Sequence, residues 1–129
     1  RLAVNCHSCV NSATQYAGIA ALEGPQDAVD GMVSAFDQRR RLIVKGLNDL
    51  PGIHCCTPAG AFYAFPNISA TGFTAKTLQD RLLEDAGVAT VAGTSFGTMG
   101  EGYIRFSYAN SIENIERALH RVEDLLELT

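Results

Sequence analysis

The segment Tyr103-Ile104-Arg105-Phe106-Ser107-Tyr108 alternates strictly between two kinds of side chain. Its even-numbered positions are all apolar or aromatic, whereas its odd-numbered positions include a charged side chain and a hydroxyl. Successive side chains of a β-strand point to opposite faces of the sheet. The segment therefore predicts a strand with one face in a core and a polar face, carrying Arg105, turned away from that core.

A helix is predicted directly after this strand. Asn110 and Glu113 lie three residues apart, which is the spacing of a capping box and typically marks the start of a helix. The apolar side chains that follow recur every three or four residues, as on the buried face of a helix. They are Ile112, Ile115, Leu119, Val122 and Leu126.

Three further short runs, bounded by glycine or proline, predict strands. They are Ile53–Cys56, Ala61–Phe65 and Val88–Val91. Between the second and third of these runs, Thr74 is the expected N-cap of a helix that ends at Gly87. We expect this helix to bury Leu78, Leu82 and Leu83.

Two helices are predicted before the first strand. Asn11 or Ser12 caps the first, and Gly24-Pro25 ends it. Asp27 is the expected N-cap of the second, which is long and amphipathic and stops at Pro51-Gly52. Its apolar positions are Val29, Met32, Phe36, Ile43, Leu47 and Leu50.

These elements predict an α/β (α+β) fold, a two-layer sandwich in which helices cover a small sheet of about three or four strands. A complete doubly wound domain is excluded because that architecture alternates strand and helix from its start. We expect residues 1–129 to form a single domain. The chain begins at Arg1 rather than methionine, which indicates a piece of a longer protein or a processed one.

Composition excludes several classes of partner. The chain has 129 residues, 47% of them hydrophobic, and a net charge of -4, so it lacks the basic stripe of a nucleic-acid-binding domain. The basic run Arg39–Arg41 lies within the long helix and is interpreted as a solvated face. No apolar stretch approaches the roughly 20 residues that span a bilayer, and no signal peptide is recognisable. We expect a soluble, cytoplasmic protein.

The cysteines, Cys6, Cys9, Cys55 and Cys56, do not have the spacing of a secreted disulfide framework. We expect reduced thiols, with any redox role left open. A zinc site is disfavoured because adjacent strand residues point to opposite faces. The histidines, which are His7, His54 and His120, are interpreted as ordinary surface or boundary residues. We therefore predict no metal ligands.

Arg105 is the strongest candidate for a functional side chain, because a guanidinium is permanently charged and its planar fork fits a carboxylate. A surface salt bridge is the alternative. The loop 93–102 carries four glycines with Thr94, Ser95 and Thr98. It lacks the lysine of a P-loop, and it leads into a strand rather than a helix, which excludes a dinucleotide fingerprint and a hydrolase nucleophile elbow. A ligand-facing or hinge loop stays open.

Three segments resemble the C-terminal region of class I/II pyridoxal-phosphate aminotransferases, the fold type I family typified by aspartate aminotransferase. They are Thr57–Pro66, Ala92–Gly97 and Tyr103–Ala109. The upstream helices, with Asn11–Gln15 and Arg39–Arg41, are also similar to that family. The resemblance implies a small C-terminal domain whose large cofactor-binding domain is absent from this chain.

The resemblance also implies roles for individual residues. The Arg-x-Ser-x-Ala pattern identifies Arg105 with the family arginine that grips the substrate α-carboxylate. Gly60, Phe62 and Tyr63 resemble the family strand that shapes the space over the substrate. Ala92 stands where many family members have proline.

The same resemblance excludes catalysis by this chain alone. Neither Lys45 nor Lys76 has the sequence context of the family's Schiff-base lysine. We therefore expect no catalytic and no cofactor-binding residue here, with pyridoxal 5'-phosphate (PLP) bound by the other domain and the isolated fragment inactive.

The implied partners are an amino acid or 2-oxo acid substrate, the large domain of the same chain, and a second subunit in a homodimer, with neither nucleic acid nor membrane. Which amino acid is the substrate stays open. One alternative is a stand-alone carboxylate-binding module. The others keep the fold but change the output, to a PLP-dependent lyase or an amino-acid-sensing regulator.

Overall fold

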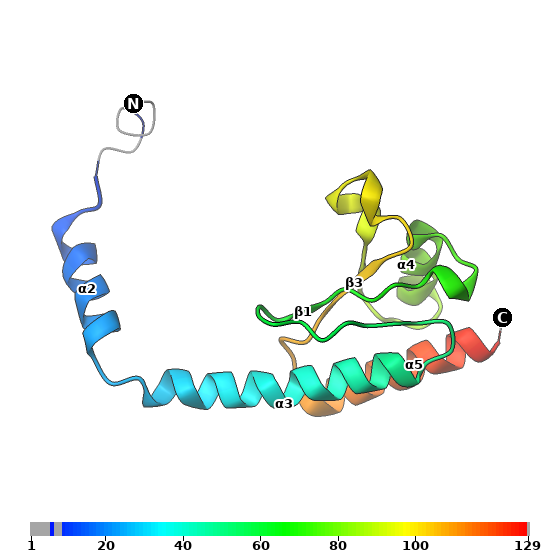
Figure 1. The fold of residues 1–129 in the computed structure, drawn as a ribbon, viewed down its shortest axis with the longest axis horizontal. Helices are drawn as coiled ribbons and strands as arrows, with labels where there is room; N and C mark the ends of the chain where they lie inside the picture. The colour runs from blue at the N-terminus through cyan, green and yellow to red at the C-terminus, as the bar shows by residue number, and fades with distance from the viewer. Residues whose placement is uncertain (1–5, 7–8, 129) are drawn as a thin grey trace. The chain divides into compact units, whose positions relative to one another are not determined.

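The structure of the chain is a computed structural model that describes residue 6 and residues 9–128 (Figure 1). His7 and Ser8 of the sequence analysis lie outside the described residues. The chain divides into two compact units, one ending at Val33 and the other beginning at Ser34.

The first unit contains helix α2, Ser12–Glu23, and the first turns of helix α3, Asp27–Asp49. The predicted cap of α2 is confirmed, because Asn11 Oδ1 accepts a hydrogen bond from the Thr14 amide at 2.9 Å. Asp27 was expected to be an N-cap but is the first helical residue of α3, where its charge faces the positive end of the helix dipole.

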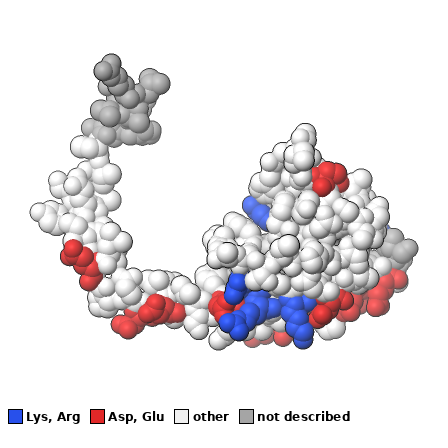
Figure 2. All heavy atoms as spheres, in the orientation of Figure 1, with Lys and Arg blue, Asp and Glu red and all other residues white. Residues whose placement is uncertain are grey.

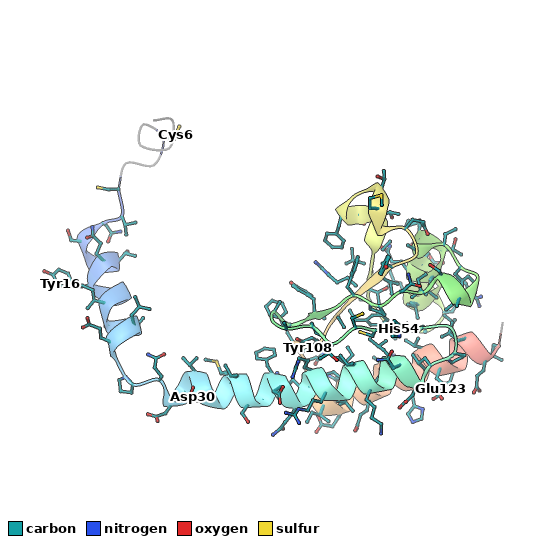
Figure 3. All side chains as sticks on the ribbon, in the orientation of Figure 1. Cys6, Tyr16, Asp30, His54, Tyr108 and Glu123 are labelled. Carbon is teal, nitrogen blue, oxygen red and sulfur yellow. The ribbon has the colours of Figure 1, made fainter. Side chains whose placement is uncertain are left out.

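None of the α2 side chains is buried within this chain. Large apolar residues of α2 and of the first turns of α3 are exposed, and Tyr16 projects outward from α2 (Figure 3). They are Tyr16, Ile19, Leu22, Val29, Met32 and Val33. A helix that is apolar on all sides is normally buried, so the first unit presents a surface suited to contact with more protein.

The second unit is built on a three-stranded antiparallel sheet in the order β1-β3-β2. The strands are β1, Tyr63–Ala64, β2, Val91–Ala92, and β3, Ile104–Ser107. The predicted alternation of the central strand is confirmed: Ile104 and Phe106 are buried, and Arg105 lies on the other face.

Helices complete the sandwich. They are the part of α3 from Ser34 onward, α4, Ala75–Glu84, and α5, Ile112–Glu127. Figure 1 shows α3 and α5 side by side beneath the sheet, and Gly46 lies where a β-carbon would come within 2.3 Å of Leu119 Cδ1. The core includes Leu47, Leu78 and Ile104. The predicted fold class is confirmed.

Two strand predictions are wrong in extent. Ile53–Cys56 contributes only an isolated bridge between His54 and Asn67, because the Asn48 side chain occupies both backbone groups of Cys55, at 2.9 Å each. Val88–Val91 is strand only from Val91 onward, since the Val88 amide donates to Leu82 O at the end of α4. Ala61–Phe65 is likewise reduced to β1.

Helix details also differ from expectation. Thr74 caps α4 as predicted, but Leu83 is exposed rather than buried. The N-cap of α5 is Ser111, whose hydroxyl accepts from the Asn114 amide, whereas Asn110 Oδ1 accepts from the Ser111 amide one residue earlier. Among the described residues, no helix is both long enough and apolar enough to cross a membrane.

Replacing Asn48 with alanine should lower the free energy of unfolding by about 1–2 kcal/mol, because the Cys55 N–H and C=O would lose their partner. Urea unfolding measures this loss. Asp49→Ala, at the next position of α3, is the control and should change stability by less than about 0.5 kcal/mol. Equal effects at both positions would contradict the role given to Asn48.

Candidate functional site

The sheet register places Arg105 on the face turned away from the core. Tyr63 pairs with Ser107, and Val91 pairs with Arg105. Because side chains alternate along a strand, Tyr63, Ser107 and Arg105 share that face. Arg105 is half-buried there.

Two aromatic rings contact the Arg105 guanidinium. Its Cζ lies 4.4 Å from the centroid of the Tyr63 ring and 4.9 Å from that of Phe96. The rings come from β1 and from a pair of 3-10 turns, Gly93–Phe96 and Thr98–Gly100, called here the 93–100 loop. Both distances fall within the range of cation–π attraction.

Arg105 makes no ion pair and no side-chain hydrogen bond with any described residue. The alternative of a surface salt bridge is therefore wrong for the described part of the chain. A half-buried guanidinium carries five N–H donors. It can therefore take a carboxylate in a bidentate, charge-assisted pair.

Further aromatic side chains extend this face. The Phe65 ring meets the Phe96 ring edge-on at 6.1 Å and stacks on the Tyr103 ring at 5.4 Å. Phe65 and Phe96 are exposed. The sequence analysis missed both, because only the register of β1 against β3 brings Phe65 beside Arg105, and only the path of the 93–100 loop brings Phe96 there.

The structure brings one of the three other predicted site residues against Arg105. Tyr63 contacts the guanidinium, and the Phe62 ring lies 4.4 Å from the Tyr63 ring. Phe62 also lies 6.2 Å from Phe36 of α3. Gly60 lies in the loop before β1, with open space where a β-carbon would stand.

Tyr108 fixes the loop that leads to Tyr63. Its hydroxyl donates to Ala61 O at 2.9 Å, and its amide donates to Phe62 O at 2.9 Å. Figure 3 shows Tyr108 between this loop and α3. Burial raises the pKa of Tyr108, so the hydroxyl remains a donor. Ala61 is held at a φ of 60°, an unusual value for a residue other than glycine.

Arg40 holds the same loop from α3. Its Nη1 donates to Pro58 O at 3.0 Å, and its Nη2 pairs with Asp37 Oδ1 at 2.6 Å. Hydrogen bonds from Arg40 and Arg41 lower the pKa of Asp37. The interpretation of the basic run as a solvated face is therefore wrong for Arg40, whose contact with Pro58 spans 18 positions and leaves no sequence signal.

Surface charge is mixed on the face shown in Figure 2, where acidic and basic side chains lie together along α3 and α5. No broad basic surface is visible in this view. A cleft of about 290 Å³ is lined in part by Arg117 and Arg121 of α5 and by Ile43 of α3, and Arg105 does not line it. Arg121 donates only to Ala86 O, at 3.4 Å.

The four cysteines are free thiols, as expected. Cys55 is buried, and burial raises its thiol pKa, which disfavours the reactive thiolate. Within residue 6 and residues 9–128, no cluster of histidine, cysteine and acidic side chains could hold a metal ion. His120 is exposed and lies 3.5 Å from Glu123.

Comparison with known proteins gives consistent matches. Residues 3–122 match the sequence profile described as aminotransferase class I and II. An aspartate aminotransferase of Pyrococcus horikoshii is 47% identical over 120 residues, which are 92% of this chain and 31% of that protein. Aromatic-amino-acid aminotransferase 2 of Thermococcus litoralis is 39% identical over 122 residues, 93% of this chain and 31% of that protein.

Solved structures agree. An aromatic aminotransferase from Pyrococcus horikoshii superposes with a TM-score of 0.89 and 40% identity, covering 98% of this chain and 34% of that one. An aspartate aminotransferase from Rhizobium meliloti gives 0.86 and 34%, with the same coverage of 98% and 34%. The chain spans about a third of the length of the relatives that it matches.

Proposed function

The chain belongs to the class I and II aminotransferase family, and on that premise we propose that it is the C-terminal small domain of a PLP-dependent aminotransferase. The proposed reaction moves an amino group between an amino acid and a 2-oxo acid. The role of this chain is to bind the substrate carboxylate.

The observation that carries the proposal is Arg105. Its guanidinium is half-buried, is contacted by two aromatic rings, and makes no pair with a described carboxylate. A two-point hydrogen bond from Arg105 to the α-carboxylate would fix both the position and the rotation of the substrate. The Cα–H bond can then be aligned perpendicular to the cofactor ring. Tyr63 would border this site, with Phe62 and Gly60 in the adjoining loop.

The residues of this chain do not themselves fit a PLP site. The cofactor is held through a lysine amine, and the chain has two lysines. Lys45 is exposed on α3, and Lys76 is ion-paired with Asp80 on α4. We therefore assign PLP to the remaining two thirds of a relative-length protein, where it would supply the electron sink of the reaction.

The exposed apolar residues of the first unit support this assignment, because they present a surface for further protein. We propose that the large domain of the same chain and a second subunit of a homodimer are the partners. A cytoplasmic location is proposed from the four free thiols.

A turnover assay tests the proposed function. With PLP, the full-length protein that contains this chain should convert an amino acid and a 2-oxo acid into their transamination products, followed by NMR. Residues 1–129 alone should give no turnover, because neither lysine fits the role. Transamination by residues 1–129 alone would overturn the assignment of PLP to another domain, and elimination products from the full-length protein would indicate a lyase.

A further inference from the structure

The orientation of the Arg105 guanidinium is set by rings rather than by hydrogen bonds. Its contacts among the described side chains are with Tyr63 at 4.4 Å and Phe96 at 4.9 Å. Arg40 and Arg41 differ, because both donate to the carboxylate of Asp37. A carboxylate anchor uses the same N–H donors that a ligand carboxylate needs, whereas an aromatic ring leaves them available.

Both rings are themselves held in place. Tyr63 is fixed by the pairing of β1 with Ser107 of β3. Phe96 meets Phe65 edge-on, and Phe65 stacks on Tyr103 with an interplanar angle of 6°. The two contacts thus come from separate elements that meet only in the folded sheet.

We propose that Tyr63 and Phe96 are positioning residues that hold the Arg105 guanidinium in the orientation in which it binds a carboxylate. The inference rests on the proposed function of Arg105 and extends it to two residues that act through it. Preorganisation of this kind raises affinity because less side-chain freedom is lost on binding.

Matched ligands isolate the effect. Pentanoate and its primary amide, pentanamide, share a carbon chain and differ in charge, so the ratio of their dissociation constants reports the contact with the guanidinium. In the full-length protein, Tyr63→Leu and Phe96→Leu should each weaken pentanoate binding about five- to tenfold and leave pentanamide unchanged. Tyr63→Phe, which keeps the ring, should restore wild-type binding.

Two further variants complete the design. Phe73→Leu is the matched control, because the Phe73 ring contacts a different guanidinium, that of Arg81, at 5.3 Å. It should change neither dissociation constant. In the Arg105→Leu background, Tyr63→Leu and Phe96→Leu should cause no additional loss, since residues that act through Arg105 have no effect without it.

Each outcome decides one of the two proposals. If Arg105→Leu leaves the ratio of pentanoate to pentanamide affinity unchanged, the proposed function of Arg105 fails. If that variant alters the ratio but the two leucine variants do not, only the positioning role fails. Equal weakening of both ligands by Tyr63→Leu or Phe96→Leu would also overturn it, because the ring would then be contacting the ligand or supporting the fold.

Discussion

Replacing Arg105 with leucine should lower kcat/KM of the full-length protein for its amino acid substrate by about 100-fold or more. A charge-assisted bidentate pair that is partly shielded from water contributes about 3 kcal/mol, and about 1.4 kcal/mol corresponds to a factor of ten. The half-burial of Arg105 and the rings beside it supply that shielding. Steady-state kinetics with the amino acid and with the corresponding amine, which has no carboxylate, measures the loss.

The comparison between the two substrates makes this result specific. Arg105→Leu should spare the weak reaction of the amine, because the amine offers no anion to bind. Arg105→Lys should recover only part of the loss, since an ammonium keeps the charge but not the planar fork. Arg117→Leu, an exposed arginine on α5, is the control and should leave both substrates unaffected. A kcat/KM reduced equally for amine and amino acid would contradict a carboxylate-binding role.

Local sequence patterns predicted the elements that depend on local information. The alternation of Tyr103–Tyr108 placed Arg105 on the polar face, and β3 has that arrangement. The cap at Asn11 and the cap at Thr74 also follow from nearby residues. In each case the physical cause lies within a few positions of the feature that it predicts.

The errors share the opposite property. Ile53–Cys56 has the composition of a strand, but the Asn48 side chain, seven residues before Cys55, takes the hydrogen bonds that a neighbouring strand would make. Arg40 is drawn from the solvated face by Pro58. Phe96 reaches Arg105 through a loop whose path the sequence does not encode as a periodic pattern. Such contacts depend on tertiary structure, and a single sequence carries no direct signal for them.

The close approach of Gly93 and Gly100 is what shapes the 93–100 loop. A β-carbon on Gly93 would lie 2.1 Å from Gly100 O and 2.8 Å from Tyr103 O, and one on Gly100 would lie 2.0 Å from Gly93 O. Gly93 also donates its amide to Tyr103 O at 2.8 Å, which ties the loop to the residue before β3. The atoms in the way are backbone, so no side-chain rotation relieves the clash.

Gly93→Ala should therefore lower the free energy of unfolding by about 3 kcal/mol or more and displace Phe96 from Arg105. Urea unfolding measures the first effect, and the pentanoate dissociation constant of the folded variant measures the second. Gly60→Ala is the control for stability, because a β-carbon there meets nothing within 4 Å, and its free energy of unfolding should stay within about 0.5 kcal/mol of wild type. A Gly93→Ala protein as stable as Gly60→Ala would mean that the two glycines do not approach each other closely, and the placement of Phe96 beside Arg105 would lose its structural basis.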